Sequence, residues 1–273
     1  MKIDFHCHTT ASDGALSPQQ LVQRAGDRGV ELLSITDHDS VSAYRQLPDL
    51  PQGLRLIPGI ELSCLWQKRG IHIVGLNIDP DSAAMAEATA TQSRARALRA
   101  EMIAEKLEKY GVDNPLAGAL ALSDGGAIGR PHFARHMVNS GFVGSESEAF
   151  KKFLGSGKTC DIKVCWPSPE QAISWIIDAG GIAVLAHPGK YSMTRSKLVS
   201  FLDDFTSWGG RAMEVVSGRQ IPSQTSDFSK LCRQFSLLAS WGSDFHSPAQ
   251  TWLDLGSYST PPPDITPVWR HWQ

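Results

Sequence analysis

Histidine and acidic residues follow several short apolar segments of this chain, and this recurrence restricts the folds that it can adopt. The first such segment lies in the opening run MKIDFHCHTTASDG. Apolar and polar residues alternate over residues 3–8, as in a short strand, so His6 and His8 point to the same face of it. Two imidazoles on one strand face can share a metal ion, and Asp13 follows in a Ser-Asp-Gly turn as a possible carboxylate ligand.

Strand-like and helix-like patterns alternate along the chain after this segment. A capping box at Ser17-Pro18-Gln19-Gln20 starts a helix that stops near Gly29, and further helices separate the later strands. This alternation predicts βα units around a parallel sheet or barrel. Seven strands are expected, over residues 3–7, 31–36, 54–60, 71–76, 182–186, 212–216 and 237–241.

The alternation is interrupted in the middle of the chain. Residues 81–109 are rich in alanine, glutamate and arginine and predict one long helix, whose arginines, Arg96 and Arg99 among them, are expected to face solvent. Because the loops that carry additional structure sit at the C-terminal ends of barrel strands, we expect this region to cover that end. The predicted division is a barrel formed by residues 1–79 and 158–273, and a helical insertion formed by residues 80–157.

Nine side chains that can bind a metal lie at or near the ends of the predicted strands. In an α/β barrel these ends converge on one mouth, where active sites are built. Nine ligands are too many for one ion, since such sites take four to six, and they suit two or three ions that share a bridging carboxylate. The set lacks cysteine, which favours a catalytic site for Zn, Mn or Fe. The candidate ligands are His6, His8, Asp13, His38, Glu61, His72, His187, Asp244 and His246.

A metal cluster of this kind has a characteristic chemistry. It lowers the pKa of a bridging water, so that hydroxide is available as a nucleophile at neutral pH, and it clamps the attacking and leaving oxygens of a phosphoryl transfer. The alternative is that each ligand is a hydrogen-bonded polar residue at a strand end. That alternative is reasonable for His72 or His187 taken singly, and it explains the joint pattern poorly. Asp4 and Asp37 lie beside ligands, where they either orient an imidazole or face solvent.

Several basic residues near the predicted insertion suit phosphate binding. Arg130 follows Gly129 at a helix start, where a guanidinium and free helix N–H groups bind a phosphate well; the alternative is an exposed arginine. His132 is placed to contact the scissile phosphate or to protonate the leaving group. Lys158 and Lys163 follow where the chain returns to the barrel, and they either add phosphate contacts or are solvated.

Composition argues against several other classes of function. The formal net charge of −2 leaves no global basic field for nucleic acid. The five cysteines are scattered and lack a C-x-x-C pair, which fits reduced thiols better than disulfides or a structural zinc site. The sequence has no signal-peptide pattern and no membrane-length apolar run, so we expect a cytoplasmic protein without a membrane partner. No feature of the sequence indicates an obligate protein partner.

The motifs that contain the ligands occur in a recognisable order. They are Asp4-Phe5-His6-Cys7-His8 with Ser12-Asp13-Gly14, Ile35-Thr36-Asp37-His38, Pro58-Gly59-Ile60-Glu61 followed by His72, Ala186-His187-Pro188, and Gly242-Ser243-Asp244-Phe245-His246. Together they resemble the motifs of the polymerase and histidinol phosphatase (PHP) superfamily, over nearly the whole chain. The resemblance implies a distorted (β/α)7 barrel of PHP type with a trinuclear metal site.

The resemblance also implies how the ligands are shared among the ions. Asp13 stands where many relatives have a histidine, which implies either a weaker third site or a preference for Mn or Mg there. Carried over by motif, the first ion is held by His6, His8, Glu61 and Asp244, the second by Glu61, His72 and His187, and the third by Asp13, His38 and His246.

The segment Arg130-Pro131-His132 and the helical insert after His72 resemble one subgroup of the superfamily. Its members are stand-alone bacterial phosphoesterases that remove the 3′-phosphate of nucleoside 3′,5′-bisphosphates, and some also trim short RNA from the 5′ end. The resemblance implies a nucleotide substrate, manganese as the first candidate metal, and His132 and Asp244 as catalytic residues. Two alternatives stay open: a histidinol-phosphate-type phosphatase of the same fold, and a non-enzymatic metal-binding scaffold.

Overall fold

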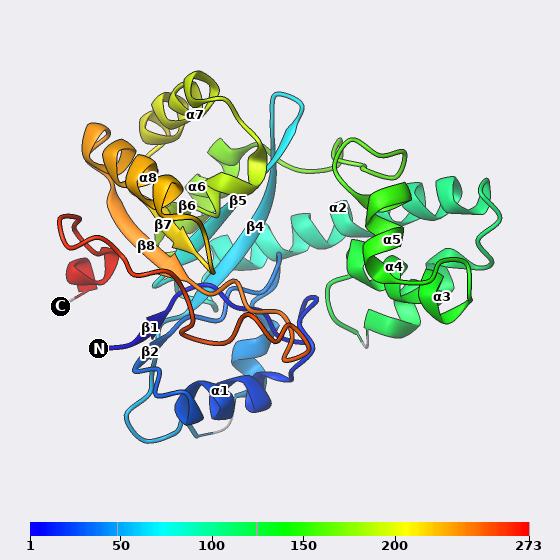
Figure 1. Ribbon diagram of the computed structural model, residues 1–273, viewed down its shortest axis with the longest axis horizontal. Coiled ribbons are helices and arrows are strands. Elements are labelled where there is room, and N and C mark those ends of the chain that lie inside the picture. Colours follow the sequence, from blue (N-terminus) through cyan, green and yellow to red (C-terminus); the bar gives the residue numbers. More distant parts are fainter. Residues whose placement is uncertain (48, 124, 273) are drawn as a thin grey trace.

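The strands of the protein form two sheets. The computed structural model describes residues 1–47, 49–123 and 125–272. The first sheet is parallel, with the order β1-β2-β3, and the second has the order β4-β5-β6-β7-β8 (Figure 1). The strands are β1 (Ile3–Asp4), β2 (Leu32–Leu33), β3 (Arg55–Leu56), β4 (Gly59–Trp66), β5 (Arg69–Leu76), β6 (Ile182–Leu185), β7 (Ala212–Ser217) and β8 (Leu238–Gly242).

The second sheet is mixed rather than parallel. β4 pairs antiparallel with β5, and β5 pairs antiparallel with β6, whereas β6, β7 and β8 are parallel to one another. The expectation of parallel strands is therefore wrong for β4 and β5, which form a tight hairpin through Gln67, a residue with a φ of 56°. The alternation of side chains has the same period in strands of either direction, so the sequence pattern does not distinguish them.

Eight strands are present in the described part of the chain instead of the predicted seven. The additional strand arises because the segment predicted as one strand over residues 54–60 is divided at Pro58. β3 ends at Leu56 and β4 begins at Gly59. Proline has no N–H group to donate to a neighbouring strand, which explains the interruption.

Two isolated bridges connect the two sheets. Cys7 pairs with Phe245, and His38 pairs with Glu61, both in the parallel sense. The described strands therefore form an α/β arrangement of two sheets in contact, and they do not form one closed barrel. Because the bridged residues are candidate ligands or neighbours of candidate ligands, the contact between the sheets coincides with the candidate site.

Helices cover both sheets. The first helix, α1 (Pro18–Asp27), begins with the predicted capping box, in which the Ser17 side chain accepts the N–H of Gln20 and the Gln20 side chain accepts the N–H of Ser17. This start of the helix is confirmed. Four helices contribute to the apolar core of the five-stranded sheet: the start of α2 (Ala83–Glu108), α6 (Pro169–Asp178), α7 (Arg195–Ser207) and α8 (Pro222–Gln234).

The described chain between β5 and β6 contains helices and no strand. Figure 1 shows α2 running from the sheets to a group formed by α3, α4 and α5. This group encloses an apolar cluster of its own, which includes Ile103, Phe133 and Leu154. The division of the chain into a barrel and an insertion stays a prediction. The helices are α2 (Ala83–Glu108), α3 (Pro115–Ser123), α4 (Arg130–Asn139) and α5 (Glu146–Ala149), and a π-helical turn follows at Phe150–Leu154.

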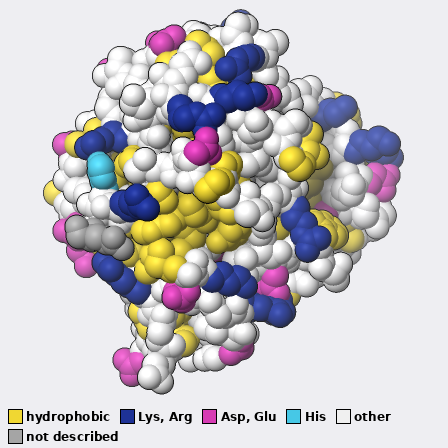
Figure 2. Space-filling model, turned by 60° about the vertical axis from the view of Figure 1, so that its left-hand side comes forward, with side chains coloured by type: hydrophobic (Ala, Val, Ile, Leu, Met, Phe, Trp, Pro, Cys, Tyr) yellow, Lys and Arg dark blue, Asp and Glu magenta, His cyan; other side chains and the backbone are white. Residues whose placement is uncertain are grey.

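The surface carries charges of both signs. Figure 2 shows an apolar patch on one face, with lysine, arginine, aspartate and glutamate side chains interspersed around it. This mixture agrees with the small net charge of −2. Among the helices of the described residues, none combines the length and the apolar character that crossing a membrane would require.

Replacing Phe201 by alanine should strongly destabilise the fold. Phe201 is fully buried, and its ring centroid lies 5.1 Å from that of Trp66 and 5.9 Å from that of Phe205. Loss of a buried phenyl ring costs about 3–5 kcal/mol, so the thermal unfolding midpoint measured by circular dichroism should fall by several degrees. Leu98→Ala is the control, because Leu98 is 52% exposed and its loss should change the midpoint little. Equal midpoints for Phe201→Ala and the wild type would contradict this account of the core.

Candidate active site

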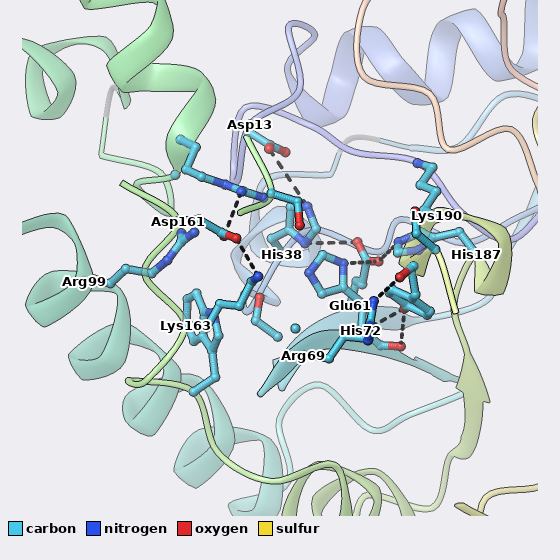
Figure 3. A pocket seen from close by; sticks show the side chains of 18 of the residues that line it. Asp13, His38, Glu61, Arg69, His72, Arg99, Asp161, Lys163, His187 and Lys190 are labelled. Atoms are coloured by element: carbon cyan, nitrogen blue, oxygen red, sulfur yellow. Dashed lines mark hydrogen bonds and ion pairs between the residues drawn. The ribbon is translucent and has the colours of Figure 1, made fainter. Parts of the chain in front are cut away.

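The structure brings all nine candidate ligands together where the two sheets meet. A cavity of about 740 Å³ opens at this point. Seven of the nine candidates line it, and the other two, His6 and His8, are buried beside them. Figure 3 shows the imidazoles of His38, His72 and His187 around Glu61.

Glu61 is at the centre of the group, and its side chain is fully buried. Its Oε1 atom lies 2.9 Å from His72 Nδ1 and 2.8 Å from His187 Nε2. The β4–β5 hairpin creates the first contact, since Glu61 pairs with Val74 and His72 lies two residues before it, on the same face of β5. Glu61, His72 and His187 are the residues predicted to hold the second ion.

The other oxygen of Glu61 faces the opening segment of the chain. Glu61 Oε2 lies 3.2 Å from His6 Nε2 and 3.4 Å from His8 Nε2. Asp244 Oδ1 lies 3.6 Å from His6 Nε2 and 3.4 Å from His8 Nε2. These four atoms belong to the four residues predicted for the first ion, and they are close enough to surround one cation.

Asp13, His38 and His246 form a third group, which His8 joins. His246 Nε2 lies 3.5 Å from Asp13 Oδ1, and His38 Nε2 lies 3.9 Å from Asp13 Oδ2. One donor atom from each of the four side chains lies within 4.8 Å of the others. The sequence prediction places His8 in the first set alone, whereas its ring also stacks on that of His246, with 4.1 Å between the centroids. The three sets therefore overlap more than the motifs imply.

Several atoms of these groups are buried without a hydrogen-bond partner among the described residues. They include Nε2 of His6, Nε2 of His8, Oε2 of Glu61 and Oδ1 of Asp13. An unpaired buried polar atom costs roughly 1–3 kcal/mol, so such atoms usually have a partner. Divalent cations would supply that partner, and the mixed imidazole and carboxylate donors suit Zn, Mn or Fe. The residues present therefore fit a metal centre.

The charges of Glu61, Asp13 and His72 also fit cation binding. Burial raises the pKa of the Glu61 carboxyl, but the imidazoles around it, His38 foremost, outweigh burial and hold the pKa well below its ordinary value. Burial also opposes the ionisation of Asp13, and His38 and His246 again bring the pKa far below the usual range. Burial lowers the pKa of His72 to about 4. At neutral pH the carboxyls are therefore anions and His72 is neutral, as metal ligation requires.

A buried glutamate that the sequence analysis missed orients two of the ligands. Glu214 lies in β7, with its Oε1 atom 2.5 Å from His6 Nδ1. Its Oε2 atom accepts the backbone N–H of His187 at 2.6 Å. A carboxylate on the second nitrogen of a metal-binding imidazole sets the orientation and basicity of the ring. The sequence feature that could have identified Glu214 is its position as the one charged residue among the apolar residues of β7.

Asp4 and Asp37 hold loops rather than imidazoles, and both are buried instead of facing solvent. Asp4 accepts the backbone N–H groups of Ser243 at 2.9 Å and of Gly256 at 2.7 Å. Asp37 accepts the backbone N–H of Thr9 at 2.7 Å and the hydroxyl of Ser12 at 2.6 Å. Each carboxylate therefore fixes a segment that carries candidate ligands.

Two of the residues predicted to bind phosphate line the cavity. Arg130 donates from Nη1 to the carbonyl of Leu154 at 3.0 Å and lies 3.3 Å from Asp161 Oδ1. Lys163 Nζ lies 2.5 Å from Asp161 Oδ2. Figure 3 shows Asp161 beside Lys163 and Arg99 at one side of the cavity. The carboxylate of Asp161 thus holds two cations at one side of the cavity.

The other two residues predicted to bind phosphate, His132 and Lys158, are not part of the cavity lining. His132 is 2% exposed, and its Nδ1 atom accepts the N–H of Gly129 at 3.0 Å, which caps the start of α4. Burial, followed by the effect of Arg135, lowers the pKa of His132 to about 4, so the ring is uncharged at neutral pH. The catalytic and binding roles of these two residues stay predictions.

The expectation that the arginines of the long helix face solvent is wrong for Arg96 and Arg99. Both are buried and line the cavity. Arg96 Nη2 lies 2.6 Å from Asp39 Oδ2, and the two guanidinium groups lie 5.4 and 5.0 Å from the ring of Trp166. Gln92 is buried on the same face of α2, at the helical spacing i, i+4, i+7. Gln92, Arg96 and Arg99 therefore form a polar stripe on an internal face of α2. Their regular spacing was the only feature of the sequence that could have pointed to it.

Two further cations were missed by the sequence analysis. Lys190 contacts the Asp244 carboxylate, and Arg69 donates to the backbone carbonyl of Tyr191. Both residues line the cavity, so it is strongly basic above the ligand cluster. Its lysine and arginine side chains are Lys68, Arg69, Arg96, Arg99, Arg130, Lys163, Lys190 and Lys197.

Comparisons with known proteins agree with this geometry. The model of the PHP domain family matches residues 4–134. The 5′-3′ exoribonuclease Rnm of Escherichia coli strain K12 is 43% identical, over 99% of this chain and 93% of the relative. A 3′,5′-nucleoside bisphosphate phosphatase of Chromobacterium violaceum is 38% identical, over 98% of this chain and 95% of the relative.

A solved structure shares the whole architecture. An amidohydrolase from Chromobacterium violaceum with bound sulfate has a TM-score of 0.90 and 36% identity, over 99% of this chain and 95% of that chain. The resemblance drawn from the motifs is therefore confirmed over nearly the full length. By its motifs, its sequence relatives and its architecture, this chain belongs to the PHP family.

Proposed function

We propose that this protein is a metal-dependent phosphoesterase that hydrolyses the 3′-phosphate of nucleoside 3′,5′-bisphosphates and also trims short RNA from the 5′ end. The observation that carries the proposal is the ligand cluster beneath a cavity lined by eight lysine and arginine side chains. Such a cavity suits an anion with more than one phosphate. The names of two relatives, a 5′-3′ exoribonuclease and a bisphosphate phosphatase, support the same chemistry.

Two or three divalent ions would occupy the cluster, with Mn as the first candidate and Zn, Fe or Mg as alternatives. When bound, these ions would lower the pKa of a water molecule and neutralise the oxygens of the phosphoryl group. The unpaired buried atoms and the anionic carboxyls support this proposal. The first ion would be held by His6, His8, Glu61 and Asp244, the second by Glu61, His72 and His187, and the third by Asp13, His38 and His246, in keeping with the distances within each set.

The two phosphates of a bisphosphate would bind at different parts of the cavity. The reacting phosphate would lie against the cluster beside Lys190, whose ammonium group contacts Asp244. Asp244 is the proposed catalytic residue because it belongs to the ligand set and lines the cavity. The second phosphate would bind at Arg130 and Lys163, in competition with Asp161 for these cations.

We also propose that residues 1–79 and 158–273 correspond to a distorted barrel of PHP type, one that is not closed by a continuous sheet, and that residues 80–157 form a cap over its mouth. The bridges between the two sheets support the barrel, and the separate apolar cluster of the helices supports the cap. Arg99 on α2 and Arg130 on α4 line the cavity from this helical region. A cap of this kind would close a nucleotide between the helices and the cluster.

A histidinol-phosphate-type phosphatase is the principal alternative of the same fold. Its substrate has a single phosphate, and a monoester next to the metal ions needs few additional cations. The cations at Arg130, Lys163 and Arg99 line the same cavity but are not among the residues that contact the cluster in the structure. A second phosphate accounts for them, so the bisphosphate is favoured. A non-enzymatic scaffold would not require such a cavity above a complete ligand set.

Metal removal should abolish catalysis reversibly. Dialysis against EDTA should eliminate phosphate release from adenosine 3′,5′-bisphosphate, because the carboxylates of the cluster cannot neutralise a phosphoryl group without bound cations. Added MnCl₂ should restore the release, measured with a colorimetric phosphate assay. Circular dichroism is the control that the metal-free protein stays folded. Full activity in protein shown by elemental analysis to contain no metal would refute the proposal.

Substitution of Asp244 should remove activity without unfolding the protein. Asp244→Asn keeps the size of the side chain and removes its charge, so kcat for the bisphosphate should fall by about a hundredfold or more. Asp264→Asn is the matched control, because the Asp264 side chain is 59% exposed and outside the cavity. Near-normal turnover of Asp244→Asn would show that Asp244 is not a ligand.

Lys163 should determine the preference for a second phosphate. Lys163→Gln removes one cation of the distal position and should raise KM for adenosine 3′,5′-bisphosphate about tenfold, with a smaller effect on adenosine 3′-monophosphate. Steady-state kinetics on both substrates measure this difference. Lys151→Gln, a change at an exposed lysine outside the cavity, should leave both KM values unchanged. An equal change for the two substrates would place the 5′-phosphate elsewhere.

A further inference from the structure

A second cavity adjoins the same ligand cluster. Its volume is about 570 Å³, within the range of small-molecule sites. It shares Asp13, Lys190, Asp244 and His246 with the basic cavity, so the two cavities meet at the ligands. A phosphate bound at the cluster therefore has space for a substituent in each cavity.

The two cavities differ in their lining. The basic cavity has eight lysine and arginine side chains, whereas the second has Arg135 and Arg219 in addition to the shared Lys190. Glu146 partly offsets these charges. The distinctive residue of the second cavity is Trp252, a large aromatic side chain that is 62% exposed. An accessible indole face beside a phosphate site is the arrangement on which the bases of single-stranded nucleic acids stack.

Local structure positions Trp252 with respect to the ligands. The segment that carries it begins directly after His246. Two backbone hydrogen bonds fold it into turns, from Gln250 N–H to the carbonyl of Ser247 at 3.1 Å and from Leu253 N–H to the carbonyl of Gln250 at 3.0 Å. The tryptophan is thus held a few residues from two candidate ligands, on the side of the cluster that the second cavity occupies.

We propose that the second cavity holds the nucleoside that follows the scissile phosphate in an RNA chain, with its base stacked on Trp252. The inference rests on the function proposed above. The terminal nucleotide carries an additional 5′-phosphate and therefore suits the basic cavity. The following nucleoside contributes a sugar and a base next to the scissile phosphate, which suits a cavity with fewer cations and an exposed aromatic ring.

The chemistry is the same for both substrates. Water adds to phosphorus, the bond between phosphorus and O3′ breaks, and the proton that water loses is taken up by O3′. A bisphosphate yields a nucleoside 5′-phosphate and inorganic phosphate. An RNA chain yields the same nucleoside 5′-phosphate and a shortened chain that keeps the phosphate on its new 5′ end, ready for another cycle.

Three substrates distinguish an effect on the second cavity from an effect on the ligand cluster. Adenosine 3′,5′-bisphosphate has no group beyond the scissile phosphate, its 3′-phosphate methyl ester has only a methyl group there, and the dinucleotide pApA has a nucleoside. Trp252→Ala should lower kcat/KM for pApA about tenfold, the effect of losing one base–aromatic stack, and leave the other two within about twofold of the wild type. Trp252→Phe keeps an aromatic ring and should retain most of the pApA activity.

Ile221→Ala is the matched control, because it removes an apolar side chain that is 60% exposed and lies outside both cavities; all three rates should be unchanged. Unchanged pApA hydrolysis in Trp252→Ala, or an equal loss on all three substrates, would overturn the proposal. The proposal would also be overturned if the wild type hydrolysed the bisphosphate but neither pApA nor the methyl ester of the bisphosphate. The phosphatase function would then stand.

Binding provides a readout that does not depend on turnover. The oligonucleotide pAAAA with a 3′-fluorescein label is titrated in EDTA and followed by fluorescence anisotropy. Trp252→Ala should bind it about tenfold more weakly than the wild type or Ile221→Ala. Equal affinities would overturn the stacking proposal. Weaker binding by Trp252→Ala together with no hydrolysis of any substrate would support the stacking and refute the proposed catalytic function.

Discussion

The buried carboxylate of Glu61 is the interaction on which the rest of the site depends. Its two oxygens lie 2.8 to 3.4 Å from nitrogen atoms of five imidazoles. A carboxylate without exposed surface is costly unless cations or hydrogen-bond donors compensate it. These imidazoles come from the segments after β1, β2 and β6 and from β5, which belong to both sheets. The negative charge of Glu61 is therefore compensated only when the two sheets meet. The bridge between His38 and Glu61 is that meeting point.

Other buried carboxylates keep the ligands in position without belonging to the cluster. Glu214 contacts the ring of His6 and the backbone of His187, while Asp4 and Asp37 accept backbone N–H groups of neighbouring loops. Each of these contacts joins segments that are distant in the chain. Ligands held in this way need little rearrangement when a cation binds, which is the general requirement for a site that must keep its geometry through a reaction.

The cluster alone would repel a phosphate, because its carboxylates are anions. The lysine and arginine side chains around the cavity reverse this effect, and they come from the β4–β5 hairpin, α2, α4, α7 and the segments before α6 and after β6. Figure 3 shows them on two sides of the ligands, with Arg99 and Lys163 near Asp161 and with Lys190 near His187. The helical region thus supplies three of the cations around the cavity, namely Arg96, Arg99 and Arg130.

The sequence by itself determined the family, the helix start at Ser17 and the set of candidate ligands that the structure brings together, because each depends on residue types at short, regular spacing. The tertiary structure decided the direction of β4 and β5, since a period of two is identical in both directions. It also decided which polar residues face inward. Arg96 pairs with Asp39, 57 residues away, and Glu214 contacts His6, 208 residues away. Periodicity indicates the face of an element on which a side chain lies, but the partner that compensates a buried charge is defined only when distant segments pack together.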